Sequence, residues 1–238
     1  DLQWAAERPS SCLRLHAGAV LGLLDACHRQ SVAQVVLLSS YHVYGGSRRY
    51  PFAVDDPANV QLSHLGAAFR AMELHAAVFA QTSPVGVTVA RMFSLYGPGQ
   101  GPDRFVPALC EAAEHRRPLP IVGDGTASRD FVFVDDAVEF LVKVMENPSP
   151  WRILNLAGGS STTLAQVAEQ VSWLADVVRR TRSLPLRPGE MPQAWADMKD
   201  AERLGFVPRT QLAEGLRRYW QWHQNRPACF RPRPERRS

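Results

Sequence analysis

A serine, a tyrosine and a histidine stand side by side as Ser40, Tyr41 and His42, where the apolar run "AQVVLLSS" at 33–40 ends. Phenol and imidazole groups can transfer protons, so Tyr41 and His42 are candidates for an acid/base pair. An unassisted phenol has a pKa of about 10, which makes it a poor base at neutral pH. The alternative interpretation is that Ser40 is an ordinary hydroxyl at a strand end, with Tyr41 and His42 as hydrogen-bonded scaffold.

Cysteine and metal chemistry are not indicated. The four cysteines, Cys12, Cys27, Cys110 and Cys229, are scattered and have no metal-ligand spacing. A disulfide framework is not expected in a chain of this size, so a reducing compartment such as the cytoplasm fits best.

Length and charge narrow the class of protein. The 238 residues are 45% hydrophobic, enough for one or two domains with full cores, and no apolar run is long enough to span a membrane. The net charge is +4, and the segment 226–238, "RPACFRPRPERRS", carries five Arg and one Glu and so accounts for all of it. We expect a solvated, Pro-rich tail there, or alternatively a dock for an acidic partner or nucleic acid. Elsewhere nothing favours nucleic-acid binding.

Strand and helix patterns alternate along the chain. Continuous apolar runs predict buried strands at 33–40, 86–93, 119–122, 129–134 and 152–158, and helical spacing predicts helices at 13–29, 61–81, 105–116, 135–146, 162–178 and 211–224. Asp135 or Asp136 is expected to cap the fourth of these helices, and Thr162 or Thr163 the fifth.

This alternation predicts a doubly wound parallel α/β sheet of the Rossmann type. The stretches 96–125 and 161–225 break the rhythm, and we assign them to a smaller mixed α/β domain that holds the substrate. The Rossmann-like domain then comprises 1–95 and 126–160.

Four segments together resemble the extended short-chain dehydrogenase/reductases, specifically the nucleotide-sugar epimerases and dehydratases. They are "VVLLSSYHVYGG", "VARMFSLYGPGQGPDRFVPAL", "VGDGTASRDFVFVDDAVEFLVKVME" and "LRPGEMPQAWADMKDAERLGFVPRT". The similarity covers about residues 8 to 224, with the segments in the family's order. It implies the Rossmann fold, NAD as cofactor and a nucleotide sugar as substrate.

The resemblance also implies which residues should react. Ser40 matches the catalytic Ser/Thr of the family. Counting from the Val-Tyr-Gly motif places Leu65 and Phe69 where the family has its catalytic tyrosine and lysine. That lysine lies one helical turn after the tyrosine and lowers its pKa, so two apolar side chains remove the base.

No other register restores the pair. The chain has two lysines, Lys143 and Lys199, and the residues four positions before them are Glu139 and Trp195. Arg70 is next to the missing lysine but points about 100° round the helix, so it is not expected to substitute for it.

The resemblance also places residues around the nucleotide diphosphate. Arg129 and Arg187 match arginines that grip the pyrophosphate, and Glu190 matches the acidic residue that meets the nucleotide ribose. Ser94 stands where the family usually has asparagine. The alternative for Arg129 and Arg187 is structural ion pairing, with Asp130 or Glu190.

The cofactor motif is not found. The family opens with a strand and a Gly-rich turn that binds the NAD pyrophosphate, and this sequence starts at what would be the middle of that domain. "GDGTASRD" is Gly-rich but follows a different strand. We therefore expect an incomplete Rossmann-like domain whose cofactor-binding residues are unknown.

Partners are predicted from the same resemblance. Family members pair through two helices, which here correspond to about 13–29 and 61–81. Both carry apolar residues: Leu23, Leu24, Met72 and Phe79. They form either a homodimer surface or a core that faces the chain's own sheet.

Three functions remain open. The first is a degenerate family member without redox catalysis that serves as a nucleotide-sugar-binding, regulatory or scaffold subunit. The second is an active NAD-dependent epimerase or dehydratase whose cofactor-binding segment lies outside this chain. The third is a purely structural subunit of a larger assembly.

Overall fold

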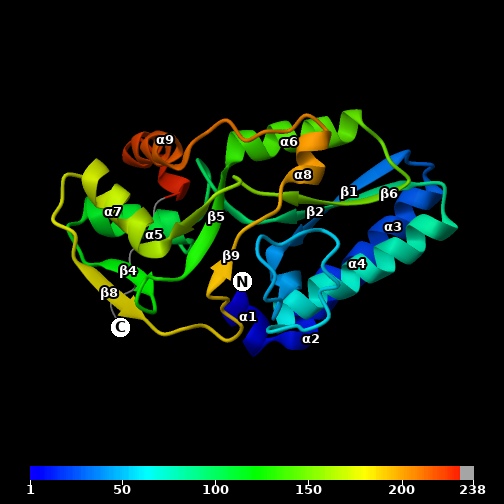
Figure 1. Cartoon of the computed structure of the whole chain (residues 1–238), viewed down its shortest axis with the longest axis horizontal. Helices are drawn as coiled ribbons and strands as arrows, with labels where there is room; N and C mark the ends of the chain where they lie inside the picture. Colours follow the sequence, from blue (N-terminus) through cyan, green and yellow to red (C-terminus); the bar gives the residue numbers. More distant parts are fainter. Residues whose placement is uncertain (231–238) are drawn as a thin grey trace.

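The structure is a computed structural model that describes residues 1–230. Its larger unit is built on a three-stranded parallel sheet of order β1-β2-β6, formed by Gln34–Ser40, Gly86–Met92 and Trp151–Leu156 (Figure 1). The register aligns Val35 with Val87, and Val87 with Trp151. The expectation of a parallel α/β sheet of the Rossmann type is confirmed.

Helices cover both faces of this sheet. On one face, α3 (Ala19–Arg29) and α4 (His64–Thr82) pack leucine, methionine and alanine side chains onto the valines of β2. On the other face, α6 (Val134–Glu146) lies over β1, and the short α8 (Lys199–Arg203) lies over β6. Leu24 and Met72 are buried in the first of these layers, so for them the core interpretation was right.

A second core occupies the smaller unit. Helices α5 (Phe105–Glu114), α7 (Leu164–Leu174) and α9 (Leu212–Gln224) pack together around β4 (Leu119–Val122), which pairs with β8 (Thr181–Leu184). Strand β5 (Ser128–Phe133) contributes Phe131 and Phe133 to this core and Val132 to the core of the larger unit. It pairs with β3 (Ser94–Tyr96), β7 (Ser161–Thr163) and β9 (Gln193–Ala194). Figure 1 shows it running between the two units.

The first helical segment differs from its prediction. Instead of one helix over 13–29, the chain forms α1 (Leu2–Glu7), α2 (Pro9–Leu13), a π-helical turn at Arg14–Gly18 and then α3. Pro9 explains the early break, because proline is accepted in the first turn of a helix but not in its interior. The short α1 packs against the start of α4 through Leu2 and Ala5.

Helix capping was predicted with mixed success. Thr163 caps α7 in a full capping box with Gln166, as expected. Asp135 and Asp136 do not cap α6: the N-cap is Phe133, and the two carboxylates lie in the first turn. Asp136 accepts a hydrogen bond from the Thr210 amide at 2.9 Å, and Asp135 pairs with Arg218, so both tie α6 to later segments.

The basic tail also departs from its prediction. Arg226, its first residue, is only 7% exposed, and its Nη2 lies 2.7 Å from Glu111 and 3.0 Å from Glu114. This pairing anchors the end of α9 to α5. Ala228–Phe230 form a short 3₁₀ turn, and residues 231–238 of the predicted tail lie outside the described residues. No helix among the described residues is both long and apolar enough to cross a membrane.

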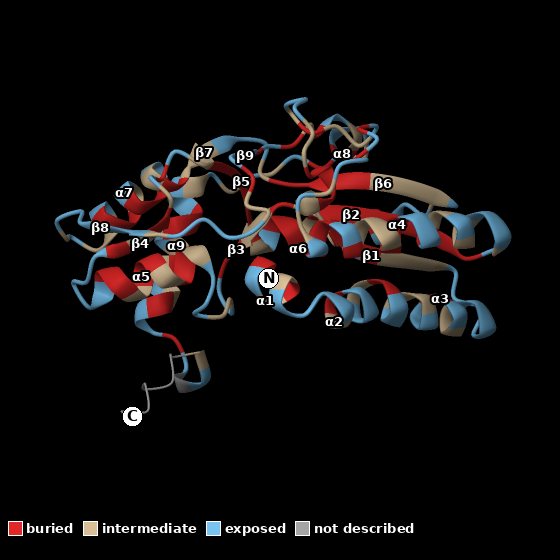
Figure 2. Ribbon diagram, turned by 90° about the horizontal axis from the view of Figure 1, so that it is seen from below, coloured by how far each residue is buried: buried red, intermediate tan, exposed pale blue. Residues whose placement is uncertain are grey.

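One edge of the main sheet is open. Among the described strands, β1 pairs on one side only, with β2, and Leu38 on it is 44% exposed. Asp136 of α6 is buried and bonds to Thr210, and α6 packs on β1. The flank of α6 opposite to Asp136 carries Val138, Val142 and Met145, which are all exposed. Figure 2 shows that β2 is mostly buried, whereas α3 and α4 carry both buried and exposed residues.

Candidate functional site

A cavity of about 650 Å³ lies at the carboxyl ends of β1 and β2, between the main sheet and the smaller unit. This is where ligands bind in open α/β sheets. Its lining includes all seven site residues predicted from the sequence: Ser40, Leu65, Phe69, Ser94, Arg129, Arg187 and Glu190. Tyr41 and His42 line it as well. One cavity therefore brings the predicted residues together.

The hydroxyl of Ser40 is paired with His42. Its Oγ lies 2.9 Å from His42 Nδ1 and also accepts the His42 backbone N–H at 3.3 Å, which caps a short 3₁₀ turn at Tyr41–Tyr44. Burial, and after it the charges of Arg129 and Arg187, lower the pKa of His42 to about 3. The imidazole is therefore neutral at pH 7, and its Nδ1 and the Ser40 hydroxyl share a hydrogen bond.

Tyr41 is placed against the arginines. Its ring stacks on His42 with centroids 4.2 Å apart, and burial raises the pKa of its phenol although the nearby Arg129 charge acts in the opposite direction. A phenol with a raised pKa stays protonated at neutral pH. Tyr41 is thus a hydrogen-bonding group here and a weak base.

Leu65 and Phe69 lie on the side of α4 that faces the cavity, one turn apart. Leu65 is 6% exposed and packs with Leu2 and Ala5 of α1. The ring of Phe69 lies 4.3 Å from that of His16. Apolar neighbours thus surround these two positions, and Arg70 turns away to bond Glu73 and the Pro57 carbonyl.

A buried ion pair fixes the position of α4, and sequence reasoning missed it. Glu73 accepts two hydrogen bonds from Arg91 of β2, at 3.0 and 2.8 Å, and a third from the Ser39 hydroxyl at 2.7 Å. Both charged residues are 1% exposed. Leu65, Phe69 and Glu73 follow one another at four-residue steps, so this anchor directs the first two toward the cavity. An acidic residue in an apolar helix and an arginine in an apolar strand were the available signals.

Arg129, Arg187 and Glu190 form one cluster. Glu190 pairs with Arg129 through one carboxylate oxygen and with Arg187 Nε, at 2.9 Å, through the other. The side chains of Arg129 and Glu190 are 6% and 7% exposed, whereas Arg187 is 44% exposed. The cluster has a net charge of +1. Ion pairing with Glu190, one of the two interpretations, is therefore present, and the exposed guanidinium of Arg187 is free to face a ligand.

Asp130 is not part of this cluster. It is fully buried, and its carboxylate accepts the Gly158 amide at 2.7 Å and the Ala196 amide at 3.3 Å. Burial raises its pKa to about 6 in spite of these bonds. Asp130 therefore ties β5 to the segments that follow β6 and β9.

Gly189 sets the loop that carries Arg187 and Glu190 against α4. Its φ is +76°, and a Cβ there would lie 2.6 Å from the Leu62 carbonyl oxygen and 2.5 Å from the Ser63 side chain. Only glycine allows both this conformation and this approach. The loop consequently touches the first turn of α4, next to Leu65.

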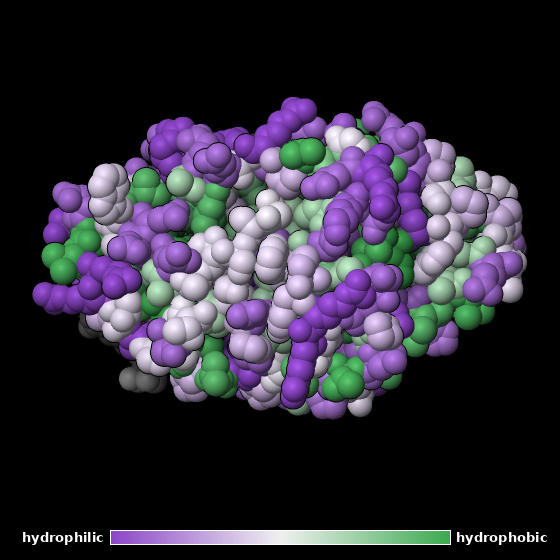
Figure 3. All heavy atoms as spheres, viewed as in Figure 1, coloured by the Kyte–Doolittle hydropathy of each residue, from purple (hydrophilic) through white to green (hydrophobic). Residues whose placement is uncertain are grey.

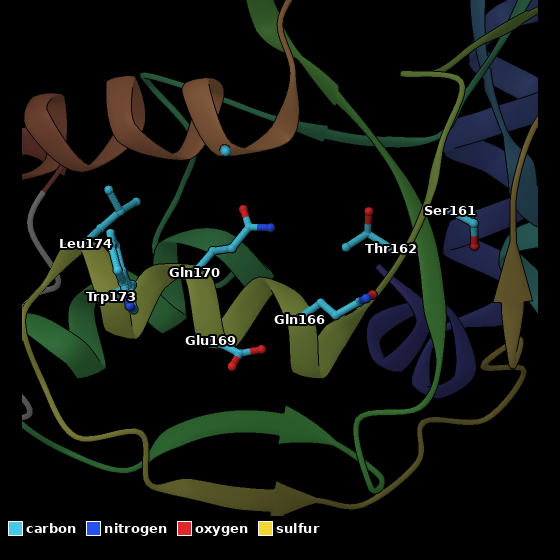
Figure 4. A pocket seen from close by; sticks show the side chains of 8 residues that line it. Ser161, Thr162, Gln166, Glu169, Gln170, Trp173 and Leu174 are labelled. Carbon is cyan, nitrogen blue, oxygen red and sulfur yellow. The ribbon is translucent and has the colours of Figure 1, made fainter.

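A second hollow lies between α7 and the start of α9, lined by Gln166, Glu169, Gln170 and Trp173 together with Thr162 (Figure 4). It contains no basic side chain among its lining residues, so it does not suit a phosphate.

Two further surface features do not add a site. Hydrophobic patches on the face seen in Figure 3 are interspersed with hydrophilic ones. Within residues 1–230, Glu111, Glu114 and His115 have the spacing of metal ligands, but Arg226 already pairs with both carboxylates.

Comparison with known proteins identifies the lineage. Residues 1–157 match the model of the NAD dependent epimerase/dehydratase family. The chain belongs to this family. A probable UDP-glucuronate 4-epimerase of Rhizobium meliloti is 27% identical over 242 residues, which cover 93% of this chain and 71% of the relative. An uncharacterized UDP-glucose epimerase of Bacillus subtilis, YtcB, is 30% identical over an alignment that covers 83% of this chain and 63% of YtcB.

Solved structures agree with this membership of the epimerase/dehydratase family. MoeE5, in complex with UDP-glucuronic acid and NAD, is 31% identical and superposes with a TM-score of 0.86, covering 94% of this chain and 76% of its own. A dTDP-glucose 4,6-dehydratase of Streptomyces venezuelae, DesIV, superposes with a TM-score of 0.88 at 23% identity, which shows the shared fold.

NAD, the cofactor of the epimerase/dehydratase family, needs a glycine-rich turn between a strand and a helix N terminus for its pyrophosphate. The described strands of the main sheet do not provide one. β1 leads into the 3₁₀ turn at Tyr41–Tyr44, β2 into β3, and β6 through Gly158 and Gly159 into β7. These three connections therefore supply no pyrophosphate turn for the dinucleotide.

Proposed function

We propose that this chain is a nucleotide-sugar-binding member of the epimerase/dehydratase family that lacks tyrosinate-driven redox catalysis and serves as a regulatory or scaffold subunit. The observation that supports it is the pairing, in one cavity, of an arginine cluster with an apolar α4 face. Arg129, Arg187 and Glu190 carry the polar part, and Leu65 and Phe69 the apolar part.

The arginine cluster suits a diphosphate. Planar guanidinium groups bind phosphate oxygens in a bidentate way, and Arg187 can do so without leaving Glu190, because its Nε alone makes that contact. Glu190 holds Arg129 rigidly and keeps a carboxylate oriented for a ribose hydroxyl. Binding then adds two negative charges to a cluster of net charge +1, which is favourable.

Calorimetric titration of the protein with UDP, UDP-glucose and UDP-glucuronate tests this proposal. We expect each to bind, and we expect no new sugar when the mixture is incubated with NAD and analysed chromatographically. Failure of all three to bind, in a protein shown to be folded, would contradict it and favour a purely structural subunit.

A second candidate is an active nucleotide-sugar enzyme that has replaced its base. The contact that favours it is Ser40 Oγ to His42 Nδ1, 2.9 Å, because a sugar hydroxyl at Ser40 could pass its proton to the imidazole. The lowered pKa of His42, about 3, makes it a weak base and places this candidate second. Conversion of a UDP-sugar would establish it.

The proposal includes self-association through the outer surface of α3 and α4. Leu24 and Met72 are buried in the core, whereas Leu23, Leu74 and Val78 lie on this outer surface and are each at least half exposed. Such residues suit a helical homodimer interface. Sedimentation of Leu74→Glu against the parent protein tests it, with a smaller species expected for the variant.

A further inference from the structure

The cavity has one wall that cannot form hydrogen bonds. Leu2 of α1 and Leu65 and Phe69 of α4 line it and pack together; we call them the apolar wall. Two polar side chains of the cavity lining are already in contact with other groups: the Ser40 hydroxyl is paired with His42, and the His16 ring packs against Phe69. A ligand hydroxyl that faces the three side chains of the apolar wall would lose its bond to water and gain none from them.

The arginine cluster stands next to this wall. Gly189, between Arg187 and Glu190, is packed on the Leu62 carbonyl and Ser63, directly before the first turn of α4. Leu65 is in that first turn. A diphosphate held by Arg187 thus places whatever is attached to it close to the apolar wall.

The chemistry of nucleotide sugars determines which atoms face the wall. The diphosphate is bonded to C1 of the pyranose, so the substituents on C4 and C6 are the ones farthest from the arginines across the ring. The part of the cavity lined by the smaller unit, at Phe105, Val122 and Leu184, remains for the nucleoside. The far edge of the sugar is then the part that contacts Leu2, Leu65 and Phe69.

From this arrangement we propose that the site selects a nucleoside diphosphate deoxy sugar, one that lacks a hydroxyl at position 4 or 6. The proposal rests on the proposed nucleotide-sugar binding. An apolar pocket gains from a buried methyl or methylene group and penalises an added hydroxyl that it cannot satisfy. We expect a deoxy sugar to bind roughly tenfold more tightly than its hydroxylated parent, within the range of up to about a hundredfold that apolar pockets achieve.

The test is a calorimetric series with four ligands: UDP, UDP-glucose, UDP-4-deoxyglucose and UDP-6-deoxyglucose. Tighter binding of at least one deoxy sugar than of UDP-glucose supports the proposal. Equal or weaker binding of both, with UDP itself binding, overturns it and leaves the proposed function standing. No binding of any of the four, UDP included, contradicts the proposed function itself.

Variants separate the apolar wall from the rest of the cavity. Phe69→Tyr keeps the ring and adds a hydroxyl that can bond a sugar oxygen. It should therefore bring the ratio of the affinities for the deoxy sugar and for UDP-glucose closer to one. Leu65→Thr should act in the same direction. Leu184→Thr, in the part lined by the smaller unit, is the matched control and should leave the ratio of affinities unchanged. A ratio that is unaffected by both wall variants, or that Leu184→Thr changes as strongly, would overturn the assignment.

Discussion

Ser40 Oγ lies 2.9 Å from Nδ1 of His42, and the same oxygen accepts the backbone N–H of His42. Burial and two arginines lower the pKa of this imidazole to about 3, so it is neutral at pH 7. The cavity therefore contains a serine hydroxyl paired with a neutral imidazole, but no strong base.

Catalysis should be absent in the parent protein. We expect no epimerase or dehydratase turnover with UDP-sugars and NAD, because Leu65 and Phe69 cannot supply a tyrosinate and its lysine. Any gain should need both Leu65→Tyr and Phe69→Lys, with either single variant inactive. Product analysis by chromatography checks this. Turnover near one per second by the parent, a rate common for enzymes, would instead assign the proton transfer to Tyr41 or His42, and loss of turnover in His42→Gln would identify the second.

Binding should depend on the arginine cluster. Arg187→Ala removes a half-exposed guanidinium and should weaken UDP-glucose binding by roughly 1.5–3 kcal/mol, the cost of a charge-assisted contact. Arg129→Ala should lower affinity by a similar amount and also lower stability, because it leaves the buried Glu190 with fewer partners. Calorimetry and a thermal melt measure the two effects. Arg217→Ala, on the outer surface of α9, is the control, and equal affinity in all three variants would remove the diphosphate site.

The buried pair between α4 and β2 should dominate local stability. Arg91→Met leaves the buried Glu73 with Arg70, at 3.3 Å, and the Ser39 hydroxyl as partners, and should cost about 3 kcal/mol of unfolding free energy, the lower end for a broken buried pair. Glu214→Gln, which breaks an exposed pair with Arg217, should have a much smaller effect. Urea unfolding followed by circular dichroism compares them. Similar midpoints for both variants would show that Arg91 and Glu73 contribute little to stability.

Stability should also depend on pH through Asp130. Its pKa rises from an ordinary value near 3.8 to about 6 in the fold, so the fold favours the protonated form. The resulting stabilisation is complete below pH 4 and is lost as the pH rises through about 6, a change of up to about 3 kcal/mol. In Asp130→Asn this titration is gone. We therefore expect the unfolding free energy of the parent minus that of the variant to fall between pH 4 and 6.5; a constant difference would contradict the raised pKa.

The open sheet edge should make the isolated chain associate. The unpaired backbone of β1, with Leu38, adjoins the apolar flank of α6, and such surfaces pair with other chains or aggregate. We expect residues 1–238 alone not to be a stable monomer. Leu38→Lys combined with Val142→Glu should increase the monomer fraction in sedimentation, whereas Val178→Glu in the smaller unit should not. A parent protein that is monomeric and melts in one sharp transition would refute this.

Local patterns predicted the regular elements well. Strands β1, β2, β4, β5 and β6 and helices α4 to α9 apart from the short α8 lie within a few residues of their expected positions, because apolar periodicity reports burial directly. The short elements β3, β7, β8 and β9 were missed. Each has two to four residues, too few to show a period, and exists because β5 or β4 offers it a partner.

The site was predicted residue by residue through the resemblance, and its contacts were not. The gathering of Ser40, Phe69 and Arg129 in one cavity follows from the shared fold. The pairing of Glu190 with both arginines and that of Arg91 with Glu73 bring together side chains from distant segments. One sequence can mark such charged residues in apolar surroundings, but it does not show which of them meet. The error over Asp135 and Asp136 is one of boundary, because α6 begins at Val134 and so places both carboxylates inside its first turn, past the capping position.

The Glu73–Arg91 pair fixes the orientation of α4 independently of the residues that this helix presents to the cavity. Because α4 is attached to the sheet at Glu73, its orientation does not depend on what occupies positions 65 and 69. Over evolutionary time those two positions are free to drift, exchanging a reactive pair for an apolar one while the scaffold persists. For the same reason, two substitutions would be enough to place the reactive groups at the cavity again, because the orientation of α4 would stay the same.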